Sequence, residues 1–234
     1  MSGAPAGAPA LRGFGAPTES VAGVALEARE LGHRYAAGRG LEPVSFALAG
    51  PGVAAITGPN GSGKSTLLRI VAGLLRPSHG ECVLTHEGRG LAPGARRGAV
   101  GLCASSVAFY EELSAGENLG FVADARGLAD PRGRVAHALA RVGLAGREGD
   151  RAGALSSGLR QRLRLAFALL HAPAVLLLDE PGSHLDEEGR ALVGRLVHEQ
   201  RERALVLIAT NDERESRLAE RVFELRGRGV GHPA

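Results

Sequence analysis

The residues with the clearest chemistry form a glycine-rich loop that reads Gly58-Pro59-Asn60-Gly61-Ser62-Gly63-Lys64-Ser65-Thr66. An apolar run at 53–56 precedes this loop and a second apolar stretch begins at Leu67. A glycine-rich turn between a strand and a helix directs successive backbone N–H groups inward, which suits a polyphosphate at the helix N-terminus. In this pattern Lys64 is placed to reach the β- and γ-phosphates, and the Ser65 hydroxyl to ligate Mg²⁺. The loop therefore predicts binding of a nucleoside triphosphate.

The use of basic residues supports that interpretation. Lys64 is the only lysine, and the other 27 basic residues are arginines. An ammonium is a compact charge whereas a guanidinium is a planar fork, so the two cations are not interchangeable. The alternative is a glycine-rich turn that contains a lysine by chance, but the strand–loop–helix context argues against it.

A second set of candidate catalytic residues follows the apolar run 175–178 and consists of Asp179 and Glu180. A buried central strand would deliver Asp179 to the carboxyl edge of a sheet, where α/β proteins bind ligands. There Asp179 could hold Mg²⁺, and Glu180 could orient or deprotonate an attacking water. Two acids at a strand end could also be ordinary surface charge. The glycine-rich loop at 58–66 makes the catalytic interpretation the favoured one.

A third feature is Ser156-Ser157-Gly158 at the start of a predicted helix. Its hydroxyls, free N–H groups and positive dipole end, worth about half a charge, could face a phosphate. When these three residues are considered alone, an ordinary helix N-cap is the better explanation.

The elements that must position these residues alternate between strands and helices. We expect strands at 24–35, 44–48, 53–56, 81–85, 99–103, 175–179, 204–209 and 222–225. The chain at 88–98 is expected to be a loop. Helices are expected at 64–75, after Pro131, at 155–171, at 187–201 and at 212–221. Another is expected from Ser114 to about Arg126, because Ser114 and Glu117 form a capping-box pattern. The pattern predicts an α/β core interrupted by a mostly helical lobe.

Composition excludes several classes of protein. The chain has 234 residues, a net charge of +3, 44% hydrophobic and 23% charged residues, and its arginines are interleaved with acids, as on a solvated surface. Eight aromatic residues argue against base-stacking platforms for single-stranded nucleic acid. Cys82 and Cys103 lack metal or redox spacing and fit a reducing cytosol. No stretch reads as a signal peptide or a membrane span.

Taken together, the motifs resemble the ATP-binding-cassette (ABC) ATPases over about residues 24–226. Gly58 to Thr66 matches the Walker A loop, Asp179 with Glu180 the end of Walker B, 155–161 the signature motif and 183–186 the D-loop, which ends at Asp186. Tyr35 lies where the family places an aromatic against adenine, although a strand-edge tyrosine is the alternative.

The resemblance implies a fold, a cofactor and partners. The fold is an α/β P-loop NTPase core with an antiparallel β edge, spanning 23–230, with a helical subdomain at about 105–172 and a disordered Ala/Gly/Pro-rich leader at 1–22. It implies Mg²⁺ and ATP, bound between the Walker A loop of one copy and Ser156, Ser157 and Gly158 of a second copy. It also implies a separate membrane permease docked near 109–113 and 117–121, a cytoplasmic location at the inner face of the cell membrane, and no nucleic acid.

Two positions depart from the family pattern. The family's glutamine after the strand ending near Cys103 aligns best with Ser105, which could touch a Mg²⁺-bound water. The family's histidine after the strand at 205–209 is replaced by Asn211, which can donate a hydrogen bond but cannot carry a proton. Because Glu180 is retained, we predict slow hydrolysis; the alternative is a regulatory module that binds ATP with little turnover.

Within the family, the local sequence at 109–119, 156–163, 167–171 and 210–211 resembles that of haem-exporter ATPases associated with cytochrome c maturation. ATPases of multidrug or other small-molecule exporters share most of these sequence motifs and are the alternative. The histidines show no ligand spacing for haem.

Overall fold

A five-stranded parallel sheet forms the centre of the structure, a computed structural model that describes residues 23–36 and 39–226. Its strand order is β6-β7-β8-β3-β9, with bounds β3 Gly52–Thr57, β6 Val100–Cys103, β7 Val175–Asp179, β8 Leu205–Ala209 and β9 Arg221–Glu224. Asp179 and Ile56 both pair with Ala209. The ends of β3, β7 and β8 therefore meet at one carboxyl edge, as the sequence predicts.

The central strands are apolar because the sheet is covered on both faces. In β7, Leu176 and Leu178 join a core cluster with the helices on one face. Val175 and Leu177 join a second cluster on the other face. This period of two is that of a strand, so each face receives alternate side chains.

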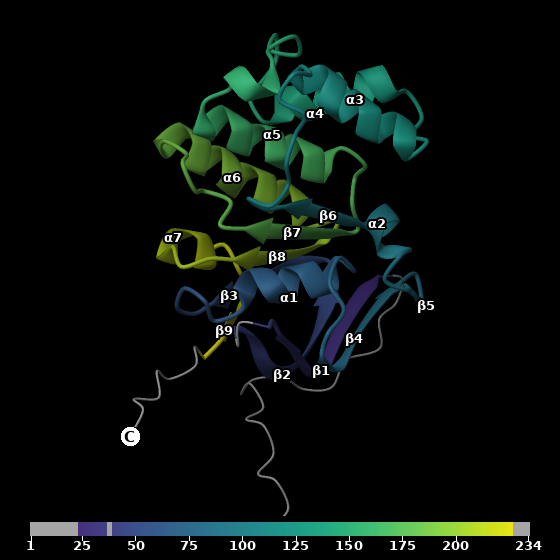
Figure 1. Ribbon diagram of the computed structural model, residues 1–234, viewed down its shortest axis with the longest axis vertical. Coiled ribbons are helices and arrows are strands. Elements are labelled where there is room, and N and C mark those ends of the chain that lie inside the picture. The colour runs from purple at the N-terminus through teal and green to yellow at the C-terminus, as the bar shows by residue number, and fades with distance from the viewer. Residues whose placement is uncertain (1–22, 37–38, 227–234) are drawn as a thin grey trace, which may run out of the picture.

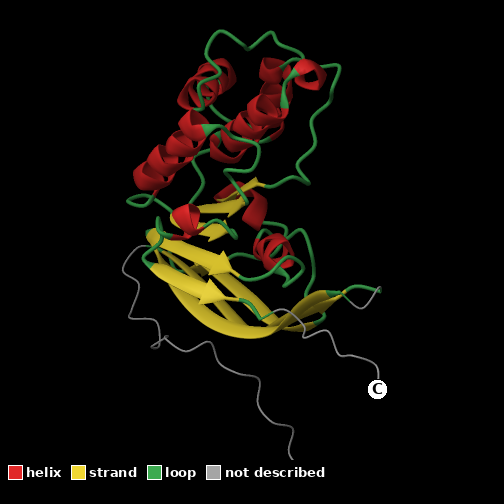
Figure 2. Cartoon of the chain, turned by 90° about the vertical axis from the view of Figure 1, so that its left-hand side faces the viewer, coloured by secondary structure: helices red, strands yellow, loops and turns green. Residues whose placement is uncertain are grey.

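The second sheet is antiparallel and has the order β2-β1-β4-β5. Its strands are β1 Val24–Arg34, β2 Gly40–Gly50, β4 His79–His86 and β5 Arg89–Gly90. Helix α1 (Lys64–Val71) contacts strands of both sheets and lies between them (Figures 1 and 2). The fold class is therefore the predicted one, including the antiparallel edge.

Helices α3 to α6 lie on the side of the parallel sheet opposite α1 (Figure 1). Helix α5 (Ser157–Leu169) packs on β6 and β7, and α6 (Glu187–Gln200) packs on β8. Helices α3 (Ala115–Ala125) and α4 (Pro131–Arg141) pack against each other, and α4 also packs on α5, at the top of Figure 1. The predicted capping box is confirmed, since Ser114 Oγ accepts from the Glu117 N–H and Glu117 Oε2 accepts from the Ser114 N–H.

Several predicted boundaries were wrong. Helix α1 ends at Val71 rather than near residue 75, and Gly73 follows with φ +73°. A side chain at Gly73 would lie 2.3 Å from the Pro93 carbonyl oxygen, so only glycine fits this turn. Helix α7 is restricted to Glu213–Ser216, and Pro131 is the first residue of α4 instead of preceding it.

The predicted loop at 88–98 contains β5 and the start of a short helix, α2 (Arg96–Ala99). The buried Arg96 guanidinium donates to the carbonyl oxygens of Ile70, Val71 and Cys82. It thereby ties α2 to the end of α1 and to β4. A 3-10 helix, η1 (Ala152–Ala154), precedes α5.

None of the helices in the described part of the chain combines the length and apolarity that crossing a membrane requires. The predicted leader at 1–22 lies outside the described residues, and the limits of the helical subdomain stay a prediction.

Candidate active site

The loop from Gly58 to Gly63 connects β3 to α1, as the strand–loop–helix pattern predicts. Gly58 adopts φ +136°, and a Cβ there would lie 2.3 Å from the Leu225 carbonyl oxygen. Gly63 is the N-cap of α1, and the helix begins without a side-chain cap or an acidic residue in its first turn. The helix N-terminus is therefore left to a ligand, and its dipole favours an anionic one.

Lys64 is buried beneath this loop. Its Nζ donates to the Gly58 carbonyl oxygen at 2.6 Å and to Asn211 Oδ1 at 2.8 Å. Burial lowers the pKa of Lys64, and the nearby Glu180 and Asp179 carboxylates oppose that shift. These contacts hold the ammonium at the cradle, next to the acids that end β7.

Asn211 joins the end of β8 to the loop. Its Oδ1 accepts from Lys64 and its Nδ2 donates to Asn60 Oδ1 at 2.7 Å. The position predicted from the family's histidine therefore lies at the phosphate loop. In this arrangement its donor is directed at Asn60.

The predicted metal ligands Ser65 and Asp179 lie side by side, with Ser65 Oγ donating to Asp179 Oδ1 at 3.0 Å. Burial raises the pKa of Asp179, while Ser65, Arg69 and Lys64 lower it. A hydroxyl and a carboxylate oxygen are ligands that suit Mg²⁺, which takes its remaining ligands from water and phosphate. The pair fits the ion without a larger acidic cluster, and the described residues contain no group of three or more metal-binding side chains.

Glu180 follows β7 with φ +48°, the left-handed region that side chains rarely adopt. Its N–H donates to the Ala209 carbonyl oxygen at 2.8 Å. Strained backbone of this kind persists only when neighbours hold it, and it is common at functional sites. The residue is half-buried at the carboxyl edge.

The signature residues lie apart from the loop. Ser156 is exposed and caps α5 by accepting from the Leu159 N–H at 3.3 Å, and Ser157 is exposed beside it. A Cβ at Gly158 would lie 3.0 Å from the His184 carbonyl oxygen, so Gly158 lets α5 approach the D-loop. Among the described residues, no hydrogen bond joins Ser156 or Ser157 to the phosphate loop.

Three further predicted site residues have these positions. Asp186 caps α6 by accepting from the Gly189 N–H at 2.8 Å. Tyr35 lies with its hydroxyl 3.5 Å from Thr66 Oγ1 and its ring edge-on to His33. Ser105 is exposed two residues after β6, and β6 pairs with β7, the strand that ends at Asp179.

The other loop residues fall into two groups. Pro59, Asn60 and Gly61 are exposed, whereas the Ser62 hydroxyl is buried with no hydrogen-bond partner in the described chain.

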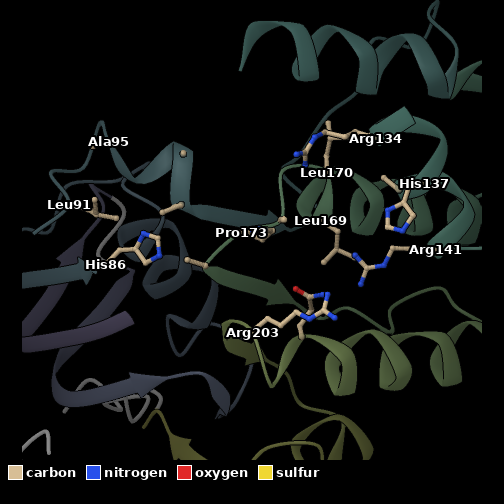
Figure 3. A pocket seen from close by; sticks show the side chains of 16 residues that line it. His86, Leu91, Ala95, Arg134, His137, Arg141, Leu169, Leu170, Pro173 and Arg203 are labelled. Atoms are coloured by element: carbon tan, nitrogen blue, oxygen red, sulfur yellow. The ribbon is translucent and has the colours of Figure 1, made fainter. Parts of the chain in front are cut away.

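A separate cavity of about 620 Å³ lies at the opposite edge of the sheet (Figure 3). Its lining includes Ala99 and Ala174, which directly precede β6 and β7. Arg134, His137 and Arg203 line it too, with Leu169 between the arginines in the view of Figure 3. Because ligands bind at carboxyl ends of parallel strands, this cavity is not the nucleotide site.

Comparison with known proteins gives the family. The profile of the ABC transporter family matches residues 41–183. The chain belongs to the ABC transporter family. It is the ATP-binding subunit of such a transporter.

Two curated relatives have transport names. The aliphatic sulfonates import ATP-binding protein SsuB 1 of Rhodococcus jostii is 37% identical over 213 residues, covering 88% of this chain and 81% of that protein. The thiamine import ATP-binding protein ThiQ of Cereibacter sphaeroides is 42% identical over 170 residues, covering 70% and 72%.

Among solved structures, the ABC fold is matched by the ATP-binding cassette MJ0796, a dimer in a post-hydrolysis state bound to ADP and Pi. The TM-score is 0.78 at 22% identity, over 87% of this chain and 97% of that chain. This likeness supports the fold.

Two contacts at this ABC site were not predicted. Gln161 Nε2 donates to the Pro181 carbonyl oxygen, and Glu215 Oε1 accepts from the Gly182 N–H. Gln161 belongs to the signature stretch, but no local signal in the sequence pairs Glu215 with a turn 33 residues upstream.

Proposed function

We propose that this ABC subunit hydrolyses ATP at the carboxyl edge of its parallel sheet. Phosphoryl transfer to water depends on positioning and charge neutralisation. Lys64 would neutralise phosphate charge and Glu180 would position the water. Ser65 and Asp179 would hold Mg²⁺, which would supply further charge neutralisation. The observation that carries the proposal is the convergence of these groups, with Ser65 Oγ 3.0 Å from Asp179 Oδ1 and Lys64 electrostatically coupled to both acids.

The complete site takes residues from two copies of the chain. The exposed tip of α5, with Ser156, Ser157 and Gly158, caps the γ-phosphate held by the loop of the other copy. Two observations support this arrangement: the tip is exposed, and it makes no hydrogen bond to its own loop in the described chain. Asp186 lies at the end of the D-loop, next to the same interface.

The helical lobe docks on a membrane permease, and the whole subunit lies on the cytoplasmic side. The exposed rings of Tyr110 and Phe121 support this docking, since they pack edge-on at 6.2 Å on a surface with no described partner. Large exposed aromatic pairs mark interaction sites. Phe109 instead packs inward against Phe167 at 6.1 Å, so its replacement would disturb the lobe itself.

Import is the favoured direction of transport. The names of both reported relatives give import, of aliphatic sulfonates and of thiamine. Neither name supports the expected haem export or cytochrome c maturation. The permease selects the cargo, so the cargo does not follow from this chain.

Replacement of the family's histidine by Asn211 favours slow turnover over fast turnover. The same replacement is the basis of a second candidate, a regulatory module that binds ATP without hydrolysis. Steady-state phosphate release by the purified chain separates the two functions.

The experiment compares the wild-type chain with Glu180→Gln, with and without Mg²⁺. Hydrolysis predicts Mg²⁺-dependent release that is abolished in Glu180→Gln, while this variant still binds ATP. A wild-type rate no higher than that of Glu180→Gln would refute the hydrolytic function and favour the regulatory module.

A further inference from the structure

The turn after Glu180 is held from two sides by buried side chains. Gln161 of α5 is 3% exposed, and its Nε2 donates to the Pro181 carbonyl oxygen at 3.1 Å. Glu215 of α7 is 8% exposed, and its Oε1 accepts from the Gly182 N–H at 2.7 Å. Pro181 and Gly182 are themselves buried. The peptide between Pro181 and Gly182 is therefore held at both its carbonyl oxygen and its N–H.

Burial of the Glu215 carboxylate at this location costs folding free energy. Its Oε2 is buried without a hydrogen-bond partner of good geometry in the described chain. Burial raises the pKa of Glu215, while the Thr210 hydroxyl and the Gly182 N–H lower it and Glu180 raises it further. A buried, incompletely paired carboxylate costs stability, and such groups cluster at functional sites.

The absence of a side chain at Gly182 makes room for this carboxylate. A Cβ at position 182 would lie 2.4 Å from Glu215 Oε1, whereas the next nearest atoms, Arg190 Cγ and Glu215 Cδ, are both 3.6 Å away. The backbone of Gly182 does not need a positive φ. The carboxylate of Glu215 is thus what excludes a side chain here, because the space is otherwise large enough.

Glu215 also belongs to the segment that carries Asn211. Thr210 is fully buried and its Oγ1 accepts from the Asp212 N–H at 2.9 Å. Asp212 in turn caps α7, which carries Glu215. The segment 210–216 therefore contacts Lys64 through Asn211 and is hydrogen-bonded through Glu215 to the turn after Glu180.

We propose that Glu215 is a positioning residue for hydrolysis: its hydrogen bond to the Gly182 N–H holds the left-handed backbone of Glu180, and with it the carboxylate that positions the water. This inference rests on the proposed function of Glu180. Gln161 supports the same turn from α5, so the helix whose tip faces the partner's phosphate in the proposed dimer is hydrogen-bonded to the turn after Glu180.

The test is a double-mutant cycle between Gly182→Ala and Glu215→Ala, with Glu215→Gln as the conservative variant. Glu213→Ala is the matched control, since Glu213 is an exposed carboxylate on the same helix that pairs with Arg217. Each variant is measured for kcat and KM of ATP hydrolysis, for thermal unfolding, and for hydrogen exchange of the Gly182 amide by NMR.

We expect Glu215→Ala to lower kcat about tenfold with KM unchanged within twofold, because the phosphate loop is untouched. Glu215→Gln keeps the acceptor and should stay within threefold of wild type. Gly182→Ala should lose about tenfold through the clash, and the double variant should be no slower than Glu215→Ala alone. Exchange at Gly182 should accelerate at least tenfold in Glu215→Ala and not in Glu213→Ala.

Three results would overturn the proposal. The first is a folded Glu215→Ala chain with wild-type kcat. The second is a double variant that loses the product of the two single losses. The third is unchanged exchange at Gly182. A wild-type chain without hydrolysis above the Glu180→Gln level would refute the proposed function instead, and the exchange measurement would still test the hydrogen bond.

Discussion

Asn211 offers a perturbation whose effects on stability and on ATP binding have opposite signs. Its amide bridges Lys64 Nζ at 2.8 Å and Asn60 Oδ1 at 2.7 Å. Asn211→Ala removes both bonds. Asn211→Asp keeps an acceptor for Lys64 and adds a negative charge next to the phosphate cradle; it loses the donor to Asn60, whose exposed amide can turn and donate instead.

The magnitudes follow from the exposure of the partners. A hydrogen bond to a charged group contributes about 1.5–3 kcal/mol, and we take the low end for Asn211→Ala because Asn211 is exposed and water can replace it. For Asn211→Asp, a partly solvated ion pair with Lys64 adds about 1 kcal/mol. In a domain of this size, 1 kcal/mol moves Tm by about 2–4 °C.

The expected order of Tm for the nucleotide-free chain is therefore Asp above Asn above Ala. ATP affinity should follow a different order, with Asn211→Asp the weakest by at least about tenfold, or 1.4 kcal/mol, because its carboxylate neutralises Lys64 and repels the triphosphate. Thermal unfolding and equilibrium binding of ATP measure the two orders. If Asn211→Asp bound ATP as tightly as wild type, the contact between Asn211 and the triphosphate-binding ammonium would be irrelevant to binding, contrary to this reasoning.

Two other predictions concern adenine recognition and pH. Tyr35→Ala should weaken ATP binding by about tenfold through lost stacking and leave binding of inorganic triphosphate unchanged; equal losses for both ligands would place the effect in the phosphate loop, through Thr66. Burial, with Arg126 and Arg134, lowers the pKa of His171 from 6.5 to about 4, so the unfolded chain binds a proton that the folded chain does not. Stability should therefore fall as pH drops from 6.5 to 4, by about 2 kcal/mol after allowing for partial exposure of the ring, and His171→Leu should remove this component. Tm measured from pH 4 to 7 checks the second prediction, and parallel curves for wild type and His171→Leu would contradict it.

The sequence predicted those parts of the fold and site that have a local pattern. The glycine loop, the apolar run before Asp179 and the Ser114–Glu117 capping box each depend on residues a few positions apart, and the structure has the corresponding loop, strand and helix start. The end of α1 was missed because packing of Pro93 against Gly73 sets it. Helix α2 was missed because the Arg96 guanidinium, whose partners lie up to 26 residues away, anchors it.

The same distinction holds at the site. Lys64, Ser65 and Asp179 could be paired from motif spacing, and Ser65 and Asp179 lie 3.0 Å apart across 114 residues of chain. The bridge from Asn211 to Asn60 and the grip of Glu215 on Gly182 could not be predicted, since only the assembled sheet edge brings these side chains together.

The proposed mechanism requires that two copies of the chain complete one nucleotide site, and ATP-dependent dimerisation tests this requirement. Glu180→Gln with Mg²⁺ and ATP should change from a 24.1 kDa monomer to a species of about twice that mass in light scattering. Ser156→Asp in the same background keeps the cap of α5, because Asp is a good N-cap residue, but directs a negative charge at the partner's phosphate. This double variant should stay folded, bind ATP and stay monomeric. A dimer that forms as readily with Asp at position 156 as with Ser would contradict the proposed mechanism.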